Sequence, residues 1–239
     1  MSDLLGEEYR KMYDGYYAGD PSSKRALGAR DSVRQIRRVV GHDKFQRIVD
    51  VGAGEGSVLA ILNEDGLAKE LYALEISGSG IDAITNRKLS NLVECKAFDG
   101  YTIPYRDKFF DLALSTHVLE HVEHERLVLR ELGRVAQRVL VVVPMEGHLR
   151  VANSISLSAP HGHINFYRPE TVKNLIETSH LRVIRSDVDC YSIEYERLIA
   201  GQFKGTIKYL IRRALLGLSP MAATSLLTHI GAFYCESNV

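Results

Sequence analysis

Short apolar runs alternate along the chain with segments in which apolar residues recur every three or four positions. Runs rich in β-branched residues are typical of buried strands, and the longer spacing is typical of helices that cover a sheet. Strands are expected near residues 46–51, 70–75, 92–97, 109–114, 137–143, 181–189 and 231–236. This alternation indicates crossover helices between parallel strands. The pattern therefore predicts an α/β fold with a doubly wound, mostly parallel sheet of seven strands.

The segment before the first expected strand, residues 1–44, is charged and rich in tyrosine. A Gly-Asp-Pro-Ser-Ser turn at 19–23 separates two expected helices, the second of which covers residues 24–40. We expect residues 1–44 to form a helical lid in which Tyr13 and Tyr16 face the substrate. The alternative is that these tyrosines pack against the domain.

Two later stretches also stand out. Residues 144–168 separate the fifth strand from a helix that begins at Pro169, and they are expected to be a long functional loop. Residues 190–239 are expected to complete the main domain, 45–239, with one helix and the last strand. That helix, 203–218, is basic and amphipathic. Most helices of this kind are solvated faces over a core, and weak peripheral contact with anionic lipid is the alternative.

Composition narrows the class of protein. The 30 lysines and arginines balance the 30 aspartates and glutamates, so no net charge favours nucleic acid or membrane. Hydrophobic residues at 45% and charged residues at 25% are ordinary for a globular protein. Three cysteines without CxxC spacing argue against a disulfide framework or a zinc knuckle. Because no apolar run reaches the roughly 18 residues of a spanning helix and no signal peptide is evident, we expect a cytoplasmic protein.

The central stretch of the chain is Ile48 to Ser57, a buried strand followed at once by Gly52, Gly54 and Gly56. Glycine allows the positive φ angles and close backbone approach that a tight turn into a helix needs. The N–H groups at such a helix N-terminus can hold an acidic or polar ligand. The spacing is GxGxG, with Ser57 where the third glycine of the dinucleotide pattern GxGxxG belongs. The loop therefore favours a nucleotide-bearing cofactor other than NAD or FAD.

Acidic residues follow the next two strands. Glu75 ends the second strand, about twenty residues after the glycines, where a carboxylate can accept both hydroxyls of a ribose. Asp99 follows the third strand and could accept the amine of adenine, with Ile76 or Phe98 packing on the ring. The carboxyl ends of neighbouring strands meet at one crevice, where open α/β sheets bind ligands. We therefore expect the acids and the glycine loop to form one site.

These motifs together resemble those of the class I S-adenosylmethionine-dependent methyltransferases. The stretch Asp50 to Gly56 is similar to their first motif, Glu75 to their ribose-binding acid, and Asp99-Gly100 to their adenine motif. Residues 110–122, which contain His-Val-Leu-Glu-His, resemble the fourth-strand motif of a group that methylates small molecules. The pattern of residues 163–169 also recurs in that group.

The resemblance covers roughly residues 40–190 and implies a Rossmann-like fold, an antiparallel last strand and S-adenosyl-L-methionine as cofactor. The residues that it places at the cofactor are Asp50, Gly52, Ala53, Gly54, Gly56, Glu75, Ile76, Phe98, Asp99, Gly100, Ser115 and Thr116. By the same resemblance, residues 115–117 lie beside the methyl group. Thr116 and His117 are therefore expected to face the substrate.

Several histidines are available for the chemistry. Methyl transfer to an alcohol or phenol needs a base, for which histidine is the usual candidate. We expect His117 and His161 to be catalytic, and His163 to bind substrate. An alternative is a divalent metal, because HxxEH spacing places three ligands on one helical face. Its ligands would be His117, Glu120, His121 and His161. The spacing is similar to the ExxEH pattern of metal-dependent methyltransferases, but histidine replaces the first glutamate, and we assign no metal.

The expected function is methyl transfer to a small molecule, most simply to an oxygen. The C-terminal residues resemble the tail of methyltransferases of bacterial surface polysaccharides, which suggests a sugar or a lipid-linked glycan. A nicotinamide-dependent oxidoreductase is the first alternative, disfavoured by Ser57 and by the lack of a Tyr-x-x-x-Lys pair. A non-catalytic binding subunit that keeps the fold is the second. A nucleic-acid partner is not expected, because no aromatic-interleaved basic patch is present; the oligomeric state stays open.

Overall fold

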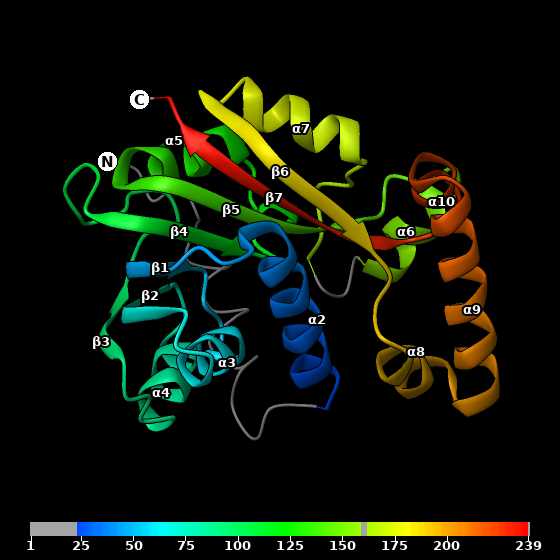
Figure 1. Cartoon of the computed structure of the whole chain (residues 1–239), viewed down its shortest axis with the longest axis horizontal. Coiled ribbons are helices and arrows are strands. Elements are labelled where there is room, and N and C mark those ends of the chain that lie inside the picture. The colour runs from blue at the N-terminus through cyan, green and yellow to red at the C-terminus, as the bar shows by residue number, and fades with distance from the viewer. Residues whose placement is uncertain (1–22, 159–161, 239) are drawn as a thin grey trace.

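A seven-stranded sheet runs through the middle of the molecule, as Figure 1 shows for the computed structural model of the chain. The structure describes residues 23–158 and 162–238. The strands are β1 (Phe45–Val51), β2 (Ala68–Glu75), β3 (Leu92–Ala97), β4 (Phe110–Thr116), β5 (Ala136–Met145), β6 (Leu181–Asp189) and β7 (His229–Ser237). All seven strands expected from the sequence are therefore confirmed.

The strand order is β3-β2-β1-β4-β5-β7-β6. β1 pairs in parallel with both β2 and β4, so that Asp50 lies opposite Ala73 on one side and Leu114 on the other. β7 runs antiparallel between β5 and β6, as the resemblance of the sequence motifs to class I methyltransferases implied. The direction of winding reverses between β1 and β4, and sheets of this kind bind ligands at such a switch point.

Helices cover both faces of the sheet (Figure 1). They are α2 (Ser23–Val40), α3 (Ser57–Glu64), α4 (Gly78–Asn86), α5 (Glu125–Val135), α6 (Val151–Ser158), α7 (Pro169–Glu177), α8 (Ile193–Ala200), α9 (Gln202–Leu218) and α10 (Pro220–Leu226). Ile48 and Leu112 belong to the core under α2, α3 and α4. Val49 and Ala113, their neighbours along the strands, belong to the core under α5 and α7. The strands around the switch point are thus buried on both faces, which explains their continuous apolar runs.

The helix expected at residues 24–40 is present as α2, and it is part of the core. Val33, Ile36 and Val40 are buried on its inner side, at the helical spacing that the sequence indicated. Residues 1–22, with Tyr13 and Tyr16, lie outside the described residues. The lid formed by residues 1–44 therefore stays a prediction.

Two stretches contain more helix than expected. The long loop predicted at 144–168 includes α6. Residues 190–239 contain α8 and α10 besides the expected helix α9 and strand β7. The interpretation of α9 as a solvated polar face over a core is wrong, because its apolar side faces outward with Phe203 77% exposed. No helix of the described residues is long and apolar enough to cross a membrane.

Candidate active site

The glycine loop between β1 and α3 adopts the left-handed backbone that its sequence predicted. The φ angles of Gly52, Gly54 and Gly56 are +76°, +57° and +78°. A Cβ at Gly52 would lie 2.5 Å from a side-chain carbon of Val118, so the turn after β4 leaves no room for one. Gly52 N also donates to Leu74 O at 2.8 Å, which fixes the loop against β2. Gly52 is therefore required by both conformation and space.

Glu75 holds the glycine loop from the end of β2. Its Oε2 accepts a hydrogen bond from Gly54 N at 2.8 Å, and its Oε1 accepts from Ser77 N at 3.0 Å and Ser77 Oγ at 2.9 Å. The side chain is only 3% exposed. Sequence reasoning placed an acid here but missed its bond to the loop. A carboxylate has roughly four acceptor positions, so one remains beyond these three.

Asp50 lies at the centre of the sheet directly before the loop. It is 1% exposed, and its Oδ1 has no hydrogen-bond partner in the described part of the chain. Burial, together with the nearby charge of Glu75, raises the pKa of Asp50 from 3.8 to about 7. The folded protein therefore binds this proton more tightly than the unfolded chain does.

We expect Asp50 to contribute a loss of stability in the ligand-free protein as pH rises. Because its folded pKa is raised, its contribution is complete below about pH 3.8 and is lost as pH rises through about 7. Asp50→Asn removes this dependence, which urea unfolding across that range measures. Asp82→Asn, at an exposed position of α4, is the matched control. Parallel pH profiles of the wild type and Asp50→Asn would contradict the assignment.

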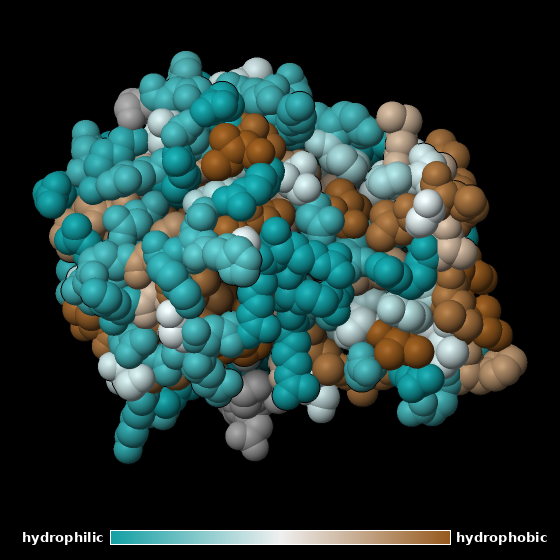
Figure 2. All heavy atoms as spheres, viewed as in Figure 1, coloured by the Kyte–Doolittle hydropathy of each residue, from teal (hydrophilic) through white to brown (hydrophobic). Residues whose placement is uncertain are grey.

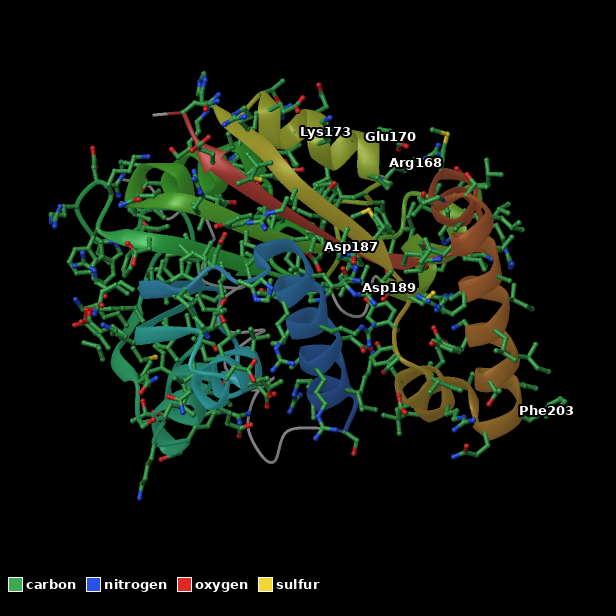
Figure 3. The ribbon with its side chains drawn as sticks, in the orientation of Figure 1. Arg168, Glu170, Lys173, Asp187, Asp189 and Phe203 are labelled. Atoms are coloured by element: carbon green, nitrogen blue, oxygen red, sulfur yellow. The ribbon has the colours of Figure 1, made fainter. Side chains whose placement is uncertain are left out.

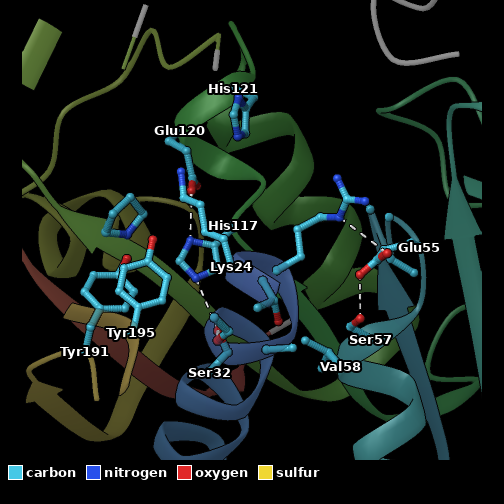
Figure 4. A pocket seen from close by; sticks show the side chains of 18 of the residues that line it. Lys24, Ser32, Glu55, Ser57, Val58, His117, Glu120, His121, Tyr191 and Tyr195 are labelled. Atoms are coloured by element: carbon cyan, nitrogen blue, oxygen red, sulfur yellow. Dashed lines mark hydrogen bonds and ion pairs between the residues drawn. The ribbon is translucent and has the colours of Figure 1, made fainter. Parts of the chain in front are cut away.

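A cavity of about 440 Å³ opens beside the glycine loop. Its walls come from the loop, α2, the turn after β4, the end of β5 and α8 (Figure 4). The sequence-predicted residues that line it are Gly52, Ala53, Gly54, Thr116, His117 and His163. The cavity is thus bounded by both the expected cofactor loop and two of the expected histidines.

His117 lies between two hydrogen-bond partners, as Figure 4 shows. Its Nδ1 is 3.2 Å from Glu120 Oε1, and its Nε2 is 3.2 Å from Ser32 Oγ. Ser32 Oγ also lies 3.0 Å from Gly28 O, so its single hydrogen can be donated either to Gly28 O or to His117 Nε2. His117 has φ of +56°, an uncommon backbone conformation for a residue other than glycine. This arrangement can hold a proton on either or both ring nitrogens.

Glu120 is fully buried beneath His117. Burial alone would raise the pKa of its carboxyl group, but the hydrogen bond with His117 and the charges of His117 and His121 lower it overall. Glu120 is therefore a carboxylate that orients the His117 ring and stabilises a proton on it. Its second oxygen, Oε2, has no hydrogen-bond partner among the described residues.

A second group of titratable side chains lies at the other side of Glu120. His163 Nδ1 is 2.8 Å from Glu146 Oε2, and the His121 and His163 rings meet edge to face at 4.8 Å. Burial would lower the pKa of His163, but Glu146 raises it overall, whereas burial lowers that of His121. One atom each of Glu120, His121 and His163 lies within 4.8 Å of the others, so this set could hold a metal ion.

Other predicted residues lie outside the lining of this cavity. They are Asp50, Gly56, Glu75, Ile76, Phe98, Asp99, Gly100 and Ser115. Asp99 Oδ1 accepts from Tyr101 N at 2.9 Å and Thr102 N at 2.5 Å, which fixes the turn after β3. His161 lies outside the described residues.

Sequence reasoning missed the contributions of α2 and α8. Lys24, Arg25 and Ser32 reach the cavity from α2, and Tyr191 and Tyr195 reach it from the segment after β6. The two tyrosine rings stack with centroids 4.5 Å apart and an interplanar angle of 19°. Tyr191 follows the carboxyl-terminal end of a strand, which is the one signal that could have suggested it.

Comparison with known proteins identifies the class of this fold and site. A family described as a methyltransferase domain matches residues 49–139, which include the glycine loop, Glu75 and the His117 turn. "Putative methyltransferase YrhH" of Bacillus subtilis (strain 168) is 29% identical over 93 residues, which are 38% of this chain. The match spans 52% of that relative's length.

Two solved structures share the fold over almost the whole chain. One is described as the "Complex between the Haloferax volcanii Trm112 methyltransferase activator and the putative methyltransferase". It has TM-score 0.68, 14% identity and coverage of 92% of this chain and 96% of that one. The other is geranyl diphosphate C-methyltransferase from Streptomyces coelicolor A3(2), with TM-score 0.65, 11% identity and coverage of 99% and 98%. Residues 49–139 thus match a methyltransferase-domain family, and the described chain has the class I methyltransferase fold. S-adenosylmethionine is the methyl donor that the family implies.

Proposed function

We propose that this protein transfers the methyl group of S-adenosylmethionine to an oxygen of a small molecule. The observation that carries this proposal is the position of His117. It lies in the same cavity as the glycine loop and is hydrogen-bonded to a buried carboxylate. The family match alone indicates only the cofactor. The pair of His117 and Glu120 adds a base that can take the proton of a hydroxyl acceptor.

The residues around the loop fit the cofactor. Gly52, Ala53 and Gly54 present backbone to the cavity where a side chain at Gly52 would collide, which suits the amino-acid part of the cofactor. We propose that Glu75 accepts from the ribose through its remaining acceptor position. The other proposed cofactor residues are Asp50, Gly56, Ile76, Phe98, Asp99, Gly100, Ser115 and Thr116.

The proposed mechanism rests on proton transfer and positioning. When bound, S-adenosylmethionine supplies a methyl group on a positively charged sulfur. His117 Nε2 accepts the hydroxyl proton of the acceptor, and Glu120 stabilises the resulting imidazolium through Nδ1. Alignment of the acceptor oxygen in the cavity supplies a further part of the rate. His161 is a second proposed catalytic residue, outside the described range.

The cavity suits a small acceptor. Its volume of about 440 Å³ lies within the range of roughly 300–1,000 Å³ that is usual for small-molecule sites. We propose that His163, with Tyr13 and Tyr16 from the N-terminal segment, contacts this acceptor. A sugar or a lipid-linked glycan is the acceptor class that we propose, and we propose no nucleic-acid partner.

Ligand-dependent stability tests the cofactor assignment. S-adenosylhomocysteine should stabilise the protein by about 2.7 kcal/mol at a hundred times its Kd, whereas NADH should have no effect. Gly52→Ala should abolish this shift, because a Cβ at 2.5 Å from Val118 displaces the loop. The control is Gly217→Ala, where a Cβ has nothing within 4 Å. Stabilisation by NADH alone would favour an oxidoreductase, and no ligand effect would favour a non-catalytic subunit.

A further inference from the structure

Helix α9 exposes one continuous apolar side. At about 3.6 residues per turn, its exposed apolar positions fall within an arc of about 100°. These positions are Phe203 (77% exposed), Ile207 (41%), Leu210 (57%), Ile211 (50%) and Leu218 (83%). Figure 3 shows Phe203 pointing away from the molecule at the start of the helix. The helix therefore presents a hydrophobic stripe to its surroundings.

The opposite side of α9 explains why this stripe cannot turn inward. Gly205 packs on the α8 backbone so closely that a Cβ would lie 2.4 Å from Glu196 O. Arg212 is 6% exposed and forms an ion pair with Glu196, which is 1% exposed. The charged pair is thus inside and the leucines are outside, the reverse of an ordinary surface helix. Rotation of α9 would break this pair and the close packing at Gly205.

The apolar surface continues beyond α9. On α10, Met221 is 65% and Leu226 is 43% exposed. Leu149, 76% exposed, lies beside α10 because its N–H donates to Ser225 O at 2.9 Å. Figure 2 shows hydrophobic residues along the edge of the molecule where Figure 1 places α9 and α10. A contiguous apolar surface of this kind marks an interaction site.

The charges beside the stripe are positive. Lys204 stands at one edge of the stripe. Arg213 stands beside the other edge, 49% exposed and paired with Asp189. No aspartate or glutamate occurs between residues 202 and 235. Two copies of this surface facing each other would bring these cations together, which disfavours self-association. Anionic lipid headgroups complement the cations, and acyl chains complement the stripe. We propose that α9 and α10 dock this protein on the surface of an anionic lipid membrane.

Such docking would hold the active-site cavity close to the bilayer. Tyr195, which lines the cavity, belongs to α8, the helix on which α9 packs. An acceptor that is anchored in the membrane could then reach the cavity without leaving the lipid. The docking itself does not depend on methyl transfer, so it can be tested without substrate.

Vesicle flotation with the full chain tests the proposal. Binding to equal parts of phosphatidylglycerol and phosphatidylcholine should exceed binding to phosphatidylcholine alone by about tenfold, and salt should reduce it. Replacing Phe203→Ser together with Leu210→Gln should weaken this binding at least about tenfold. Both positions are exposed, so the variant should keep its helical content and its free energy of unfolding.

The matched control combines Val93→Ser and Leu127→Gln, at apolar positions 56% and 41% exposed on β3 and α5. It should bind vesicles as the wild type does. Equal binding to both vesicle types, or equal loss in the control, would overturn the proposal. Light scattering adds a further check: a wild-type dimer that the Phe203 and Leu210 variant dissociates, without vesicle binding, would assign the surface to a second copy.

Discussion

Replacing His117 by asparagine is expected to lower kcat for methyl transfer by about 10²–10⁴-fold. The variant keeps a side chain that tolerates φ of +56° but cannot take the acceptor proton. Binding of S-adenosylhomocysteine should be unchanged, because the glycine loop does not depend on the imidazole. Single-turnover kinetics with a methylated product as readout, together with titration of the cofactor, separates these two effects.

Glu120→Gln is the companion variant for the positioning role. It keeps the shape beneath His117 but removes the charge that stabilises the imidazolium. We therefore expect kcat to fall and the rise of activity with pH to move to lower pH, because the neutral base then forms at lower pH. Ser32→Ala should have a smaller effect, because Ser32 contacts the ring only through Nε2 at 3.2 Å. Full activity of His117→Asn would contradict the proposed role of His117 as the general base. Loss of wild-type activity on chelation would instead assign Glu120, His121 and His163 to a metal.

The sheet was predictable because its strands are buried on both faces. Ile48 and Val49 point to opposite cores, so both must be apolar, and this requirement is visible in the sequence. The glycine loop was predictable for a related reason: positive φ and close packing at Gly52 exclude other residues. Features that follow from backbone conformation or continuous burial are thus readable without a structure.

The contacts of the site were less predictable because they join distant segments. Ser32 and His117 are 85 positions apart, and nothing in the local pattern of α2 indicates that its serine faces the turn after β4. The bond from Gly54 to Glu75 likewise competes with the ribose role that spacing alone suggested. The prediction that the apolar face of α9 packs on the core was wrong for another reason. Periodicity gives the width of an apolar face but not which side of the helix is covered.

A large loss of stability is expected from Glu196→Ala. The substitution leaves the Arg212 guanidinium, 6% exposed, without its carboxylate inside the α8–α9 contact. Removal of one partner of a buried pair costs about 3–5 kcal/mol. Burial already lowers the pKa of Arg212, which shows that its charge is poorly solvated. Urea unfolding monitored by circular dichroism measures the change.

The control is Lys208→Met, which removes a second cation 3.0 Å from the same carboxylate but at a side chain that is 42% exposed. Solvent screening should limit its effect to about 1 kcal/mol or less. Combining Glu196→Leu with Arg212→Met should recover most of the stability, since replacing a whole buried pair by apolar side chains is often neutral. If Glu196→Ala cost no more than Lys208→Met, the pair would be solvated, and the packing at Gly205 would remain as the contact that holds α9. The outward stripe would then lose one of the two contacts that hold it, so this measurement also tests the basis of membrane docking.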